Sequence, residues 1–183
     1  MTRLPAILDS RIFPTSELHA LVLDGEAYRV DDCMAAVDEL PTPALRAQAV
    51  AAELPQRLIA EQHTAAWIWG AQFQPPARHE VCADIDARTR PTLNVRLRVR
   101  EVVILHEDVA LLAGLSVTTP MRTAIDLARF VTDWSEDEAQ ILRELIRLGG
   151  FSVLDCARTM NRRKNLPAKK LALERLALAG PPF

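Results

Sequence analysis

The sequence predicts an α+β fold in which a small antiparallel sheet is flanked by N-terminal and C-terminal helices. Between residues 79 and 118 apolar and polar residues alternate, which is the period of a strand. Helix caps and stops occur on both sides of this stretch. With 183 residues, of which 49% are hydrophobic, the chain is long enough to bury one sizeable core.

The first forty residues predict a short helix followed by a strand. Thr15 or Ser16 can cap a helix that carries Leu18 and ends near Gly25, because glycine favours the left-handed conformation found after helices. Residues 26–30 then predict a strand.

An alanine-rich helix is predicted to begin at Thr42 and Pro43 and to run to about Leu54. Proline cannot continue a helix without a kink, so Pro55 predicts a kink or a new helical start over residues 56–61.

The next predicted helix contains Trp67 and Trp69 and ends at Gly70. Residues two apart on a helix point in different directions, so we expect one tryptophan in the core and the other at its rim. His63, at the head of this helix, is expected to cap it or to hydrogen-bond a neighbour. Residues 72–78 predict a loop.

Two strands are predicted over residues 81–85 and 95–100. One face of the second carries only arginines, and we call it the arginine stripe: Arg96, Arg98 and Arg100. Such a face is either the solvated side of an antiparallel sheet or a surface for phosphate or an acidic partner.

A turn, a strand and a helix are predicted in immediate succession after residue 113. Gly114 suits a tight turn, and residues 115–118 alternate as a strand. Thr119 can cap a helix with proline at its first position. Arg122 and Asp126 lie four apart on that helix and can form an ion pair.

Further helices are predicted towards the C-terminus. Ser135 begins a capping box, and the helix that follows ends at residues 149–150, both glycine. Residues 151–160 are amphipathic, and a last helix is predicted from Pro167 until just before Gly180.

Charge is unevenly distributed along a chain whose net charge is −2. Residues 1–60 hold nine acidic and five basic side chains, whereas residues 111–183 hold eight and eleven. We call the dense C-terminal group the basic cluster: Arg158, Arg162, Arg163, Lys164, Lys169 and Lys170. It is either a solvated face or, with the arginine stripe, the candidate surface for DNA or a protein partner.

No cofactor, metal or membrane site is predicted. Cys33, Cys82 and Cys156 form no C-x-x-C pair, which favours buried or idle thiols over zinc ligands or disulfides. The sequence has no apolar run long enough for a membrane span and no signal peptide at its start, which predicts a cytoplasmic protein.

The hypothesis that the chain is an enzyme depends on Asp84 and Asp86, whose D-x-D spacing is that of the carboxylates that bind Mg²⁺ in nucleotidyl enzymes. The Gly-Ser turn that accompanies this Mg²⁺-binding motif is absent from the sequence. Every lysine lies beyond the predicted sheet, and no G-x-S-x-G elbow occurs. We therefore predict no catalytic residue and keep the nucleotidyl enzyme as the alternative.

Residues 114–128 resemble the G-L-P-V-T-T-P-x-R-T-x-x-D-L-A pattern of the C-terminal domain of AbiEi-type antitoxins, departing from it at Ser116. Residues 62–70 are similar to the H-x-S-A-A-x-L-x-G helix of the same family, with Thr64 in place of serine.

The resemblance implies that residues 42–183 form an AbiEi-like antitoxin domain. Family members are bacterial regulators that accompany nucleotidyltransferase toxins and usually begin with a winged helix-turn-helix. Residues 1–41 have room only for a reduced winged-helix-like element, so DNA binding is expected to be weak. The implied function is a non-catalytic, antitoxin-like regulator that binds a toxin, DNA or both. A stand-alone interaction domain without a toxin is a further alternative.

Overall fold

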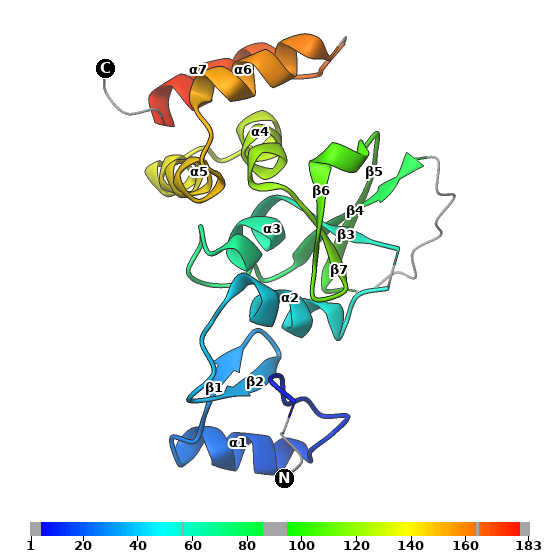
Figure 1. The fold of residues 1–183 in the computed structure, drawn as a ribbon, viewed down its shortest axis with the longest axis vertical. Coiled ribbons are helices and arrows are strands. Elements are labelled where there is room, and N and C mark those ends of the chain that lie inside the picture. The colour runs from blue at the N-terminus through cyan, green and yellow to red at the C-terminus, as the bar shows by residue number, and fades with distance from the viewer. Residues whose placement is uncertain (1–4, 56, 86–94, 164, 180–183) are drawn as a thin grey trace. The chain divides into compact units, whose positions relative to one another are not determined.

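The computed structural model describes residues 5–55, 57–85, 95–163 and 165–179 (Figure 1). The chain divides into two compact units, one of residues 1–56 with 111–115 and the other of residues 57–110 with 116–183. Helices and two sheets are both present, which confirms the predicted α+β class.

The first unit opens with α1 (Thr15–Leu23), followed by the antiparallel strands β1 (Ala27–Val30) and β2 (Cys33–Ala36). The residue before α1 is Pro14, and no side chain caps the helix, so the predicted cap at Thr15 or Ser16 is wrong. The end of the helix near Gly25 is confirmed, since Asp24 closes α1 and Gly25 has a φ of 75°.

The alanine-rich helix is α2 (Pro43–Ala51). As predicted, the Thr42 side chain caps it by accepting a hydrogen bond from the Leu45 amide at 3.2 Å. Its buried residues lie within the first unit, which extends to residue 56. The domain boundary after residue 41 stays a prediction. The Cys33 thiol lies 3.9 Å from the Ala49 carbonyl oxygen, which shows that α2 packs near β2.

After Pro55 the chain enters β3 (Ile59–Ala60), so the predicted helical segment over residues 56–61 is wrong. Leu58 and Ala60 are buried, and Ile59 is paired on both sides, with β4 and with β7. A β-branched residue between two buried neighbours favours the centre of a sheet over another helical turn.

The main sheet has five strands in the order β5-β4-β3-β7-β6. Strand β3 runs antiparallel to β4 (His79–Asp84) and parallel to β7 (Leu115–Thr118), and β4 runs parallel to β5 (Leu97–Val102). The sheet is therefore larger than expected and mixed rather than antiparallel. The alternation that predicted the strands does not encode their direction, and residues 85–96 are long enough for a parallel connection.

Strands β6 (Val109–Leu112) and β7 are joined by the predicted tight turn. Ala113 and Gly114 have φ values of 48° and 88°. Positive φ at both central residues is typical of the turns whose twist matches that of a β-hairpin.

Among the described residues, five α-helices belong to the second unit: α3 (Gln62–Trp69), α4 (Pro120–Phe130), α5 (Glu136–Gly149), α6 (Val153–Arg162) and α7 (Lys169–Ala179). Helix α4 contacts each of the other four and places its buried face in their shared core (Figure 1). No helix in the described ranges is long and apolar enough to cross a membrane.

The predicted helix signals in this unit are largely confirmed. Gly70 and Gly150 end α3 and α5 in the left-handed conformation, and the Ser135 hydroxyl caps α5. Trp67 is buried, and Trp69 is half-buried with its Nε1 donating to the Thr118 carbonyl at 2.8 Å.

Candidate functional site: a buried ion-pair network beside an arginine-lined pocket

The joint between β7 and α4 directs two charged side chains of α4 into the protein. The Thr119 hydroxyl accepts from the Arg122 amide at 3.4 Å, as expected of a helix cap. One turn later, Arg122 Nε donates to Asp126 Oδ2 at 2.8 Å. The side chains are only 5% and 1% exposed, so the predicted pair is confirmed and lies in the core.

Asp126 is the centre of a larger network. Its carboxylate also accepts from Arg129 Nη1 at 3.0 Å and from Arg100 Nη2 at 3.4 Å. Arg100 donates in addition to both carboxylate oxygens of Glu61, at 2.8 and 2.6 Å.

The network continues from Arg122 to Asp108 and Arg163. Arg122 Nη1 donates to Asp108 Oδ2 at 2.6 Å, and Arg163 Nη2 donates to Asp108 Oδ1 at 2.6 Å. We call these residues the ion-pair network: Glu61, Arg100, Asp108, Arg122, Asp126, Arg129 and Arg163. Four cations therefore face three anions.

Burial changes the electrostatics of this network. Burial raises the pKa of the Glu61 carboxyl group, and the hydrogen bonds from Arg100 oppose that rise without cancelling it. Burial favours a lower pKa for Arg122, yet its contacts with Asp126 and Asp108 outweigh burial and raise that pKa. The charge of Arg122 is therefore held by its partners, and deleting one of them would leave a buried charge uncompensated.

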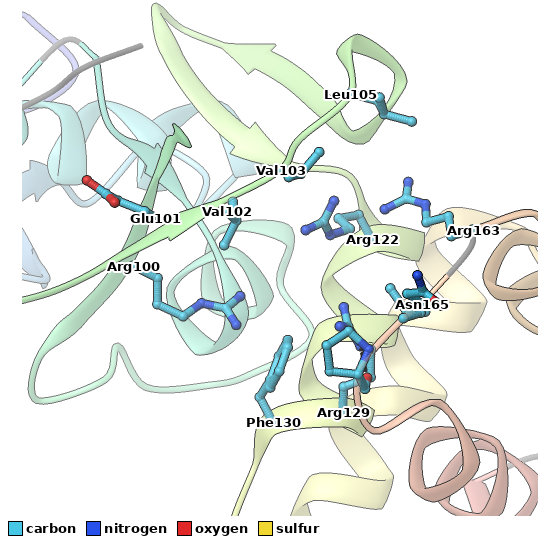
Figure 2. A pocket seen from close by; sticks show the side chains of 12 residues that line it. Arg100, Glu101, Val102, Val103, Leu105, Arg122, Arg129, Phe130, Arg163 and Asn165 are labelled. Carbon is cyan, nitrogen blue, oxygen red and sulfur yellow. Dashed lines mark hydrogen bonds between the residues drawn. The ribbon is translucent and has the colours of Figure 1, made fainter. Parts of the chain in front are cut away.

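A pocket of about 560 Å³ lies against the network, and we call it the arginine pocket (Figure 2). Its apolar lining comes from Val102, Val103, Leu105, Phe130, Leu166 and Pro167, and its cationic lining from Arg100, Arg122, Arg129 and Arg163. Glu101 is the one acidic residue among the described lining residues, and Figure 2 shows its carboxylate pointing away from the arginines.

The Phe130 ring orders two of these arginines. The guanidinium carbons of Arg100 and Arg129 lie 4.4 and 4.3 Å from the centre of the ring. Such cation–π contacts add to the carboxylate bonds and fix the direction of each guanidinium group.

His63 bridges two carboxylates elsewhere in the second unit. Its Nδ1 lies 2.8 Å from Glu80 Oε2 and its Nε2 lies 3.0 Å from Glu138 Oε1, which confirms the predicted hydrogen bond to a neighbour. Burial alone would lower the pKa of His63, but the bonds to Glu138 and Glu80 outweigh it and raise the pKa to about 9. The ring is therefore charged at neutral pH.

The arginine stripe does not form one solvated face. Strand β5 begins at Leu97, so Arg96 precedes it and is half-buried. Arg98 is exposed and lies 3.5 Å from Glu80, while Arg100 turns into the ion-pair network. The part of this sheet face around Arg100 is covered by α4, because Arg100 reaches Asp126 there.

The basic cluster is likewise divided. Arg158, Arg162 and Lys170 are exposed on α6 and α7, and Lys169 is half-exposed. Arg158 pairs with Asp155 on its own helix at 3.3 Å. Arg163 instead belongs to the ion-pair network, and Lys164 lies outside the described residues.

Asp84 is the last residue of β4, and Asp86 lies outside the described residues. Within the described ranges, no group of three or more His, Cys, Asp and Glu side chains is placed to hold a metal. The three cysteines are buried free thiols, and burial raises the pKa of Cys33 to about 11. The prediction of buried thiols is thus confirmed.

Sequence reasoning missed four contributors to the site: Glu61, Asp108, Arg129 and Phe130. Arg129 could have been found, because it lies three residues after Asp126 on the same helix. Glu61 and Asp108 meet their arginines across long sequence separations, for which a single sequence carries no local signal.

The fold is similar to that in the crystal structure of the RV2827C protein from Mycobacterium tuberculosis, with a TM-score of 0.52. The two sequences are 16% identical, and the match covers 97% of this chain and 73% of that chain, so it is evidence for the fold alone. No curated protein matches the sequence.

Residues 58–148 match the AbiEi antitoxin C-terminal domain. This range includes the β7–α4 joint, the His63 helix and every network residue except Arg163. The match confirms the resemblance found in the sequence motifs. Residues 58–148 of the chain therefore belong to the AbiEi antitoxin C-terminal domain family.

Proposed function

We propose that the chain is a non-catalytic, antitoxin-like regulator that acts by binding a toxin. The observation that carries this proposal is the AbiEi antitoxin domain at residues 58–148. The family resemblance makes a nucleotidyltransferase-type toxin the expected partner. A toxin gene beside this one supports the proposal, whereas its absence favours the stand-alone interaction domain.

The contact surface that we propose is the exposed part of the basic cluster: Arg158, Arg162, Lys169 and Lys170. These side chains lie on α6 and α7, where they can reach an acidic partner or phosphates. Arg163 and Arg100 are excluded from this surface because their guanidinium groups are bound to buried carboxylates.

We further propose that any DNA binding is weak and electrostatic. The first unit is acidic over most of its length and contains two described helices, α1 and α2, with the two-stranded hairpin between them in the sequence. An acidic surface repels phosphates, and a helix-turn-helix needs two helices joined by a short turn.

Replacing Arg162, Lys169 and Lys170 together with glutamine is expected to weaken binding to the toxin or to a DNA duplex and to flatten its salt dependence. For a duplex, the salt slope should fall by roughly one for each phosphate contact that is lost. Titrations at several salt concentrations measure both quantities.

The matched control replaces three arginines of other surfaces with glutamine: Arg29 and Arg147, which are exposed, and Arg143, which is half-exposed. It removes the same charge from the chain. Equal weakening in the control would show that only total charge matters. Tight, sequence-specific duplex binding that depends on Arg29 would show that the N-terminal unit reads DNA.

A further inference from the structure

The guanidinium groups of the arginine pocket have more hydrogen-bond donors than the protein uses. Within the described ranges of the chain, Nη1 of Arg100, Nη2 of Arg122 and Nη2 of Arg129 donate to no protein acceptor. None of these nitrogens is sealed from solvent. Since all three residues line the pocket, their unused N–H groups are available to a ligand there.

The surrounding charges favour an anion. The four arginines of the wall face three carboxylates, and each carboxylate already accepts hydrogen bonds from at least one of these arginines. The carboxylates and the Phe130 ring hold the cations in place before any ligand arrives. A fixed set of charges loses little entropy on binding.

The size of the arginine pocket and the depth of its arginines limit the class of ligand that it can bind. A cavity of about 560 Å³ falls in the range of sites for small organic molecules, and half of its described lining residues are apolar. The side chains of Arg122 and Arg129 are only 5% and 6% exposed, which is too deep for the backbone of a duplex. A carboxylate has two acceptor oxygens, whereas a phosphate group has three and carries up to two negative charges. A phosphate group can therefore accept from more of the unused N–H groups than a carboxylate can.

We propose that the arginine pocket binds a small phosphorylated organic molecule of about nucleotide size. The phosphate would accept from the unused N–H groups of Arg100, Arg122 and Arg129. It would also accept from Arg163, whose guanidinium group donates, among the described residues, only from Nη2 to Asp108. The rest of the molecule would lie on the apolar lining. The site goes beyond the proposed antitoxin function, because it requires neither a toxin nor DNA.

Calorimetric titration of the full chain at low salt and without divalent cations tests this site, with nucleoside monophosphates and inorganic phosphate as probes. We expect a saturable response to at least one nucleotide and weaker binding of inorganic phosphate. Arg163→Gln should reduce the nucleotide affinity by at least about tenfold, because a charge-assisted hydrogen-bond donor is lost.

Arg147→Gln is the matched control, since it removes one charge and one Arg–Glu pair from α5 but does not line the pocket. Its affinity should stay within about twofold of the parent value. Arg163→Lys, which keeps the charge and loses the planar fork, should fall between the two.

The proposal is overturned if no nucleotide binds, if inorganic phosphate binds as tightly as the nucleotides, or if both glutamine variants lose affinity equally. An unchanged circular dichroism spectrum and melting temperature of Arg163→Lys would show that a loss of affinity does not come from unfolding. Failure of the chain to neutralise a toxin would leave this result unaffected, so the two proposals can fail separately.

Discussion

Replacing Asp126 with alanine is expected to lower the free energy of unfolding by about 3–5 kcal/mol. The carboxylate is 1% exposed and accepts from Arg100, Arg122 and Arg129. Its removal leaves three guanidinium groups at the core with too few anions, and a buried charge without its partner is strongly destabilising.

Urea unfolding followed by circular dichroism measures this loss. The control is Glu174→Ala, which removes a carboxylate from an exposed i,i+4 pair with Lys170 at 4.0 Å. Exposed pairs contribute little to stability, so the control should change the midpoint far less. A loss for Asp126→Ala no larger than that of the control would contradict the buried network.

The second large effect is on the pH dependence of stability. The pKa of His63 is about 9 in the folded protein and about 6.5 in the unfolded chain. A raised folded pKa stabilises the protein fully below about pH 6.5, and the stabilisation is lost as the pH rises through 9. The expected loss from this group is about 3 kcal/mol.

Unfolding free energies measured between pH 6 and 10, in steps of about half a unit, test this expectation. His63→Gln should be less stable than the parent at pH 6.5 and should show a much flatter profile above it, because no proton is then bound between Glu80 and Glu138. Parallel profiles for the two proteins would show that His63 is not the titrating group.

Local chemistry made much of the second unit predictable from the sequence. Thr119 and Ser135 cap helices where a hydroxyl precedes an apolar-periodic segment, and Gly114 lies in a turn that requires positive φ. The Arg122–Asp126 pair follows from helical spacing alone. These features depend on residues that are close in sequence, which is why a single sequence is enough to find them.

The direction of the strands and the extent of the network could not be found in the same way. Strand alternation is identical in parallel and antiparallel pairs, so β4 and β5 gave no sign of running parallel. Arg100 meets Glu61 across 39 residues and Arg163 meets Asp108 across 55, and the fold alone brings them together. The sequence therefore predicts the arginine stripe and the basic cluster as surfaces, although Arg100 and Arg163 are bound to buried carboxylates.

Growth rescue tests the central claim, that this chain is an antitoxin-like binder without catalysis, most directly. Where a nucleotidyltransferase-type toxin gene lies beside this one, cells that express that toxin would also express the chain or its Asp84→Ala variant at matched levels. The account predicts that both proteins restore growth equally, because neutralisation needs binding and not the carboxylate at the end of β4. Failure of the chain to restore growth, or loss of rescue with Asp84→Ala, would contradict it.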